Sequence, residues 1–211
     1  MGTVLTLAPV DDGEIDVLLA EPKRIEEFYG FAEHAAVWEK YGTDLPFGDG
    51  PRWLRWLSRL FGGPGVGRSL RVTEQLLAEL PKGPEGEIDL DKAWNGLHFL
   101  LTGTADGGDG PGAFIIEGGT EVGDVDVGYG PARAFRSDEV AAIDAHLRSL
   151  TDDELLGRLD QAAMTRLSVY PDVWDEPPEE SLEYLGHYLG ELRGFLTATT
   201  ERSSGMVVRF C

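Results

Sequence analysis

The sequence has one cysteine, and that cysteine is the last residue, Cys211. No intramolecular disulfide can form, so cysteine usage gives no indication of an oxidising compartment. The chain also lacks the run of about 18 apolar residues that a membrane-spanning helix requires, and its first residues lack the cationic region of a signal peptide. We therefore predict a cytoplasmic protein without a membrane span.

Basic residues are scarce, because 18 Lys and Arg stand against 38 Asp and Glu and give a net charge of -20. A field of this sign repels phosphate backbones and anionic lipids, which excludes nucleic acid as a partner. An acidic surface suits a basic protein partner, although the same charge also serves plain solubility. Charge by itself selects no function, and the sequence defines no oligomeric state.

The common sequence motifs of catalytic and cofactor sites are missing. The chain has no phosphate-binding G-x-x-x-x-G-K-[ST] loop, no G-x-S-x-G elbow and no H-E-x-x-H pair. Its four histidines are isolated in sequence, and the stretch "DGGDGPG" lacks the later ligands of a calcium loop. We predict no cofactor and no metal, and the absence of a catalytic signature favours a non-enzymatic protein.

Breaker residues and hydrophobic spacing divide the first half into elements. Gly and Pro are concentrated at both ends of 41–67, which we interpret as an inserted amphipathic arm. The other expected elements are a strand at 3–10, a helix capped by Asp11 or Asp12, helices at 69–81 and 88–101, a loop at 103–112 and a strand at 113–119.

The second half shows its helix caps. Ser137 precedes an apolar series at helical spacing, and Thr151 with Glu154 forms a capping box for a further helix through Leu155, Leu159 and Leu167. Pro178 is placed to open a long amphipathic helix, and residues 205–211 form a closing strand. We predict a single α/β domain over 1–211, with a mixed sheet that includes the N- and C-terminal strands and packs against several amphipathic helices.

Several ordered motifs resemble those of a known family. The stretches "DKAWNGLHFLLTG" (91–103), "DVGYGPARAF" (126–135) and "YPDVW" (170–174) precede a long helix and a terminal apolar strand. This order is similar to that of the YfbM-like family of bacterial proteins of unknown function. The resemblance implies a single α/β domain and carries over no activity, substrate or catalytic residue. The arm at 41–67 looks like an addition to the shorter members.

The helix in "DKAWNGLHFLLTG" separates polar from apolar side chains. At about 100° per residue, Asp91, Asn95, His98 and Thr102 fall on one side, which we call the polar stripe. Its side chains are short hydrogen-bonding groups that fit against another element or a pocket wall. In one interpretation Asn95 and His98 tie the helix to neighbouring backbone. In the other they form a ligand pocket, with His98 moving a proton and Trp94 as a further contact.

The stretch "DVGYGPARAF" supplies two more candidate ligand-binding residues. Flanking glycines and Pro131 would hold Tyr129 and Arg133 in defined positions near a junction of strand and helix. Arg133 suits a ligand carboxylate or phosphate, but in a chain this acidic an arginine is more often paired with an internal Asp or Glu.

The arm at 41–67 contains a basic amphipathic stretch, "RWLRWLSRLF". Its apolar side suits either a partner protein or the domain's own core. The candidate partner-binding residues are Trp53, Trp56, Leu57 and Leu60.

Two classes of function remain. The first is a non-enzymatic interaction protein, of the inhibitor or immunity type, that masks a basic partner. The alternative is a small-molecule-binding protein or hydrolase with a pocket around Asp91, Asn95 and His98, which requires these side chains and those of Tyr129 and Arg133 to converge in space. We favour the first class.

Overall fold

The computed structural model describes residues 2–31 and 83–211. The chain divides into two compact units, Met1–Ile25 with Pro84–Cys211 and Glu26–Gly83. The predicted helix at 69–81 and the arm at 41–67, with its candidate residues Trp53, Trp56, Leu57 and Leu60, lie outside the described residues. One domain with an inserted arm therefore stays a prediction.

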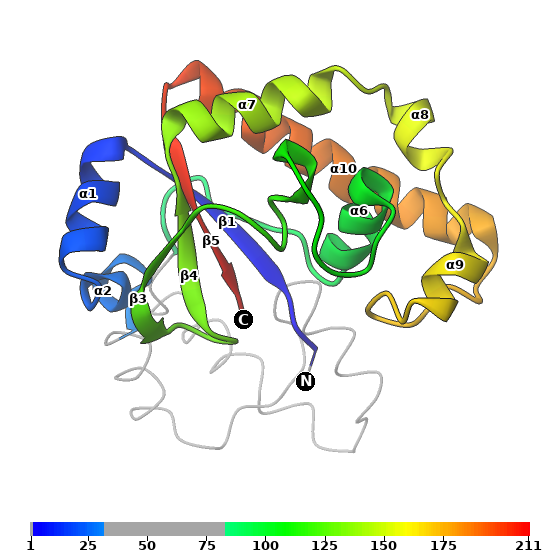
Figure 1. Ribbon diagram of the computed structural model, residues 1–211, viewed down its shortest axis with the longest axis horizontal. Helices are drawn as coiled ribbons and strands as arrows, with labels where there is room; N and C mark the ends of the chain where they lie inside the picture. The colour runs from blue at the N-terminus through cyan, green and yellow to red at the C-terminus, as the bar shows by residue number, and fades with distance from the viewer. Residues whose placement is uncertain (1, 32–82) are drawn as a thin grey trace, which may run out of the picture. The chain divides into compact units, whose positions relative to one another are not determined.

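The first unit is built on a five-stranded sheet with the order β2-β1-β5-β4-β3 (Figure 1). Its strands are β1 (Leu5–Val10), β2 (Ile88–Asp89), β3 (Thr120–Asp126), β4 (Pro131–Phe135) and β5 (Gly205–Phe210). The N- and C-terminal strands lie side by side, as predicted, with Leu5 opposite Phe210 and Val10 opposite Gly205.

The predicted mixed sheet is corrected in one respect: all four strand pairings in the described part are antiparallel. A tight hairpin over 127–130 joins β3 to β4, which forces this pair to run antiparallel.

The central strands of the sheet carry apolar side chains, and helices cover them. Helices α7 (Ser137–Arg148) and α10 (Pro178–Glu201) pack against each other and against β5, and α6 (Ala93–Thr102) packs against α10. Their buried side chains form one core with those of β1 and β5, including Leu97, Ile143, Leu185, Leu192 and Val208. Helix α1 (Asp12–Ala20) packs against β3.

Three helix starts agree with the predicted caps, whereas Ser137, predicted as a cap, is the first residue of α7 and Arg136 holds the N-cap position. Asp11 caps α1 by accepting a hydrogen bond from the Glu14 amide at 2.8 Å. The Thr151 and Glu154 capping box opens α8 (Asp152–Leu156), and Pro178 opens α10. The helix predicted to run on from α8 instead stops at Gly157, and Asp160 caps a separate helix, α9 (Gln161–Arg166). A further short helix of the described residues, α2, spans Arg24–Phe28.

Two predictions around the polar stripe are wrong. The helix predicted from 88 begins only at Ala93, because Ile88 and Asp89 pair with β1 and Asp91 has a left-handed backbone with φ 48°. The strand predicted at 113–119 is a short 3-10 helix, η2 (Pro111–Ala113), followed by turns. Gly118 and Gly119 both have positive φ values, which an extended strand does not accommodate.

Candidate functional site

Asn95 and His98 of α6 are buried and bind backbone groups. The Asn95 side-chain amide donates to the Ala105 carbonyl oxygen at 2.6 Å, and its oxygen accepts from the Tyr170 amide at 2.8 Å. His98 Nε2 lies 2.8 Å from the Gly107 carbonyl oxygen. Because a carbonyl only accepts, Nε2 carries the proton of the neutral ring. These contacts agree with the interpretation in which the stripe ties α6 to neighbouring backbone.

His98 is unusual in two respects. Its Nδ1 is buried and has no hydrogen-bond partner among the described residues. Burial lowers the pKa of His98, while the Gly107 carbonyl and the carboxylates of Glu117 and Asp106 oppose this effect. The ring is therefore neutral near pH 7.

The two ends of the polar stripe have different surroundings. Thr102 donates its hydroxyl to the His98 carbonyl oxygen at 2.8 Å and also accepts from the Thr104 amide. Asp91 lies before the helix and accepts a hydrogen bond from the Tyr184 hydroxyl at 3.3 Å. Burial, with Asp91 adding to it, raises the pKa of Tyr184.

Trp94 lies one helical turn before His98 in α6. Its indole N–H donates to the Thr3 carbonyl oxygen at 3.0 Å. The ring stacks on Tyr170 at a centroid distance of 5.8 Å and meets Phe210 edge-on at 4.9 Å. Trp94 thus connects α6 to the first and last strands of the sheet.

Tyr129 and Arg133 occupy different parts of the β3–β4 hairpin. Tyr129 lies in the turn, and its side chain is 57% exposed. Arg133 lies within β4, and its guanidinium donates to the carbonyl oxygens of Phe114, Ile115 and Gly118 at 3.2, 2.6 and 3.1 Å. Arg133 therefore holds the turns after η2 in place and has backbone carbonyls, not an acidic side chain, as its hydrogen-bond acceptors.

Burial lowers the pKa of the Arg133 guanidinium, and the carboxylates of Glu117 and Glu121 oppose that effect. The described residues contain no group of three or more His, Cys, Asp or Glu side chains that could hold a metal ion.

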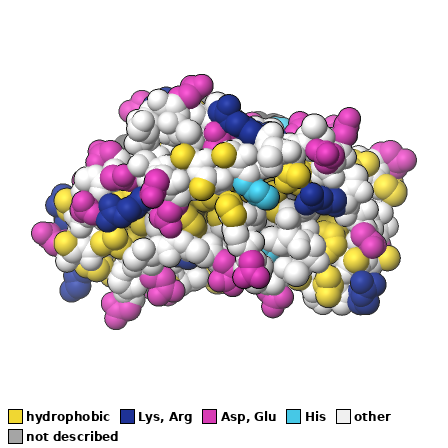
Figure 2. All heavy atoms as spheres, turned by 45° about the horizontal axis from the view of Figure 1, so that its top comes forward, with side chains coloured by type: hydrophobic (Ala, Val, Ile, Leu, Met, Phe, Trp, Pro, Cys, Tyr) yellow, Lys and Arg dark blue, Asp and Glu magenta, His cyan; other side chains and the backbone are white. Residues whose placement is uncertain are grey.

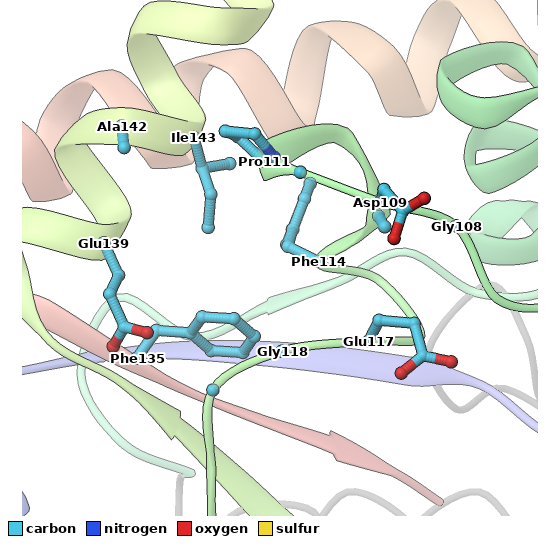
Figure 3. A pocket seen from close by; sticks show the side chains of 13 residues that line it. Gly108, Asp109, Pro111, Phe114, Glu117, Gly118, Phe135, Glu139, Ala142 and Ile143 are labelled. Atoms are coloured by element: carbon cyan, nitrogen blue, oxygen red, sulfur yellow. The ribbon is translucent and has the colours of Figure 1, made fainter.

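A pocket of about 350 Å³ lies between α7 and the segment from Gly108 to Gly119. Its inner surface is apolar and comes from Ala113, Phe114, Phe135 and Ile143, each at most 3% exposed. Figure 3 shows Ile143 and Phe114 extending toward the ring of Phe135. Phe114 and Phe135 meet edge-to-face at a centroid distance of 6.5 Å.

The outer edge of the pocket is acidic. Glu139 of α7 lies on one side, and Asp109 and Glu117 lie on the opposite side (Figure 3). All three residues are exposed. Among the described residues that line the pocket, none is Lys, Arg or His. Figure 2 brings forward the side of the molecule on which α7 lies, where acidic side chains are numerous and Lys, Arg, His and hydrophobic side chains are exposed among them.

The pocket and the predicted ligand-binding residues are separate sets. None of Asp91, Trp94, Asn95, His98, Thr102, Tyr129 and Arg133 lines the pocket. Two of them support its wall indirectly, because His98 binds Gly107 beside the pocket residue Gly108, and Arg133 binds the pocket residues Phe114 and Gly118.

The sequence contained a weak signal for this pocket in the Gly- and Asp-rich stretch 103–112, which we interpreted as a loop. Phe135, Glu139 and Ile143 carry no such signal, because their spacing is that of a strand end followed by an ordinary amphipathic helix.

Comparison with known proteins identifies a family match and a similar solved structure. The family model described as "Domain of unknown function (DUF1877)" matches residues 1–209. A crystal structure of YfbM from Escherichia coli, a protein of unknown function, is 17% identical, with a TM-score of 0.56 and coverage of 99% of each chain. No curated protein matches the chain. Within residues 2–31 and 83–211, no helix combines the length and apolarity needed to cross a membrane.

Proposed function

The chain belongs to the DUF1877 family, whose description assigns no function, and we propose that it is a non-enzymatic interaction protein that binds a basic protein partner. The family resemblance predicted from the motifs is confirmed, as is the α/β fold with both terminal strands in one sheet. The basic partner is our inference from charge and geometry.

The observation that carries the proposal is that six of the nine arginines of the described part bind groups within the chain. Four form internal salt bridges: Arg136 with Asp16, Arg148 with Asp144, Arg193 with Asp152, and Arg209 with Glu87. The guanidinium groups of Arg133 and Arg158 donate to backbone carbonyls.

These internal contacts leave a large excess of carboxylates, because the chain has 38 Asp and Glu against 18 Lys and Arg. An uncompensated field of one sign attracts a partner of the opposite sign, speeds the encounter and disfavours acidic competitors. This is the behaviour expected of a protein that masks a basic surface.

The alternative, a small-molecule-binding protein or hydrolase at the polar stripe, needs side chains that are available to a ligand. The Asn95 amide, His98 Nε2 and the Thr102 hydroxyl instead bind backbone groups of this chain. This arrangement supports a structural role for the stripe and favours the interaction proposal.

The test is capture of partners from a lysate of the producing cells with the full-length tagged protein, at low and at high salt. Each captured protein is then purified, and its dissociation constant is measured against salt concentration. We expect a specific partner with a basic isoelectric point whose binding weakens steeply as salt rises, because exposed charges are screened.

A charge control separates specific binding from general adhesion of polycations. Polylysine binds any strongly acidic protein, so a second acidic protein of similar size and net charge is carried through the same measurements. A captured basic protein that binds both proteins equally, or a specific partner that is acidic and insensitive to salt, contradicts the proposal.

A further inference from the structure

We propose that the pocket between α7 and the segment from Gly108 to Gly119 is an anchor site for one arginine or lysine side chain of the basic partner. This inference rests on the proposed function and adds the point of attachment. The pocket lies entirely within one compact unit of the chain, and all of its lining residues fall between 108 and 143.

The interior of the pocket suits the aliphatic part of such a side chain. Phe114 comes from the turn after η2, Phe135 from the end of β4 and Ile143 from α7, and their side chains converge (Figure 3). Arginine and lysine bury an aliphatic stem along apolar surface while the charged end stays near water or a counter-ion. A simple metal ion would gain nothing from an apolar interior.

The edge of the pocket suits the charged end of the side chain. Asp109, Glu117 and Glu139 are exposed carboxylates on opposite sides of the opening. Glu139 also accepts a hydrogen bond from the Arg136 amide at 2.7 Å, through one of its two oxygens. Because an ionised carboxylate accepts several hydrogen bonds, this contact leaves Glu139 able to bind a cation.

The chain's own nearby arginines bind other groups of the chain and do not line the pocket. Arg133 passes beneath the pocket wall, where its guanidinium donates to three backbone carbonyls and lies 5.6 Å from the centre of the Phe135 ring. Arg136 pairs with Asp16 of α1. Neither is among the residues that line the pocket, so the charge of the opening is complementary to an incoming cation.

The size of the pocket is compatible with a single long side chain. Its volume of about 350 Å³ lies at the lower end of the range of roughly 300–1,000 Å³ for small-molecule sites. A long side chain with a few water molecules fits this space. Buried anchors of this kind, often arginine, contribute much of the affinity of protein interfaces.

The experiment is a titration of the isotope-labelled full chain, followed by NMR, with the peptide acetyl-Gly-Arg-Gly-amide. The matched neutral peptide contains citrulline in place of arginine. We expect amide shifts confined to the pocket-lining residues with the arginine peptide and at least roughly tenfold weaker binding with the citrulline peptide, because the charged contact is lost.

Two alanines of α7 provide a matched pair of variants. Ala142 and Ala145 are both exposed on the same helix, but only Ala142 lines the pocket. Ala142→Trp fills the opening and should abolish peptide binding, whereas Ala145→Trp should leave it unchanged. Circular dichroism confirms that both variants are folded.

Each outcome has a distinct meaning. Equal binding by the two tryptophan variants, or shifts away from the pocket, overturns the anchor site. Tighter binding of free spermidine than of the arginine peptide in the pocket also overturns it, in favour of a small-molecule cation site. If the captured basic partner binds Ala142→Trp as tightly as the wild type, the anchor site fails while the proposed function stands. If no basic protein binds specifically, the proposed function fails.

Discussion

The side chain of Asn95 joins three segments of the chain, and its closest long-range partner is Tyr170, whose backbone amide donates to Asn95 Oδ1 at 2.8 Å. The same side chain donates to Ala105 at 2.6 Å. Asn95 is only 4% exposed and both hydrogen bonds are partly buried, so the two backbone groups are poorly placed to bind water when the side chain is removed.

Asn95→Ala should therefore lower the free energy of unfolding by about 1–3 kcal/mol, because two partly buried backbone groups lose their partners. Urea unfolding followed by circular dichroism measures the change. Thr104→Ala is the comparison, because its hydrogen bonds lie in an exposed loop. A loss for Asn95→Ala no larger than that for Thr104→Ala would contradict the role of Asn95.

The stability of the fold should fall on mild acidification because of His98. Burial lowers the pKa of His98 below its usual 6.5, so the unfolded chain binds a proton at higher pH than the folded chain does. The stabilising contribution is complete above about pH 6.5 and is lost as the pH falls from there through the lower pKa of the folded state.

Urea midpoints between about pH 5 and pH 8 test this expectation. His98→Gln should remove part of the pH dependence of stability. The control, His187→Gln, changes an exposed residue of α10 and should leave that pH dependence in place. A wild-type curve with the same slope as that of His98→Gln would show that His98 does not contribute.

Arg133 should stabilise the turns that follow η2. Replacing it with Met keeps much of the apolar stem and removes the donors to the carbonyls of Phe114, Ile115 and Gly118. We expect a loss of about 2–4 kcal/mol. Hydrogen exchange should show its largest increase at 114–118, whereas an increase spread evenly over the chain would indicate a general loss of stability.

Gly205 should tolerate no side chain. An added Cβ would overlap the Phe135 carbonyl oxygen and lie 2.6 Å from Ile15 Cδ1. Gly205→Ala should cost about 3 kcal/mol or more. Gly194→Ala in α10, where no atom lies within 4 Å of the added Cβ, should instead gain up to about 1 kcal/mol from helix propensity. Thermal unfolding of the two variants should shift in opposite directions.

Elements with local start signals were predictable from the sequence. Asp11, the Thr151 and Glu154 box and Pro178 each act within one helical turn, so α1, α8 and α10 begin where expected. The apolar run at 113–119 misled the strand prediction, because its burial beneath α7 depends on Arg133, which lies in a different element.

The site was less predictable for the same reason. The separation of the polar stripe from the apolar side of α6 was correct for Asn95 and His98, but their partners lie in a loop and a turn whose backbone the sequence does not specify. The pocket takes residues from the 108–119 segment, β4 and α7, which lie apart in the sequence, so no single local motif predicts it. Only the completed fold brings these side chains together.

The position of β5 affects the order in which the molecule is assembled. This strand lies between β1 and β4 and forms hydrogen bonds with both, yet it is the last of the described elements to leave the ribosome. Strand β1, made first, has to wait for more than 190 further residues before its main neighbour exists. Synthesis of β5 should therefore be the event that permits closure of the sheet, and nascent chains that stop before Gly205 should remain accessible to proteases and chaperones.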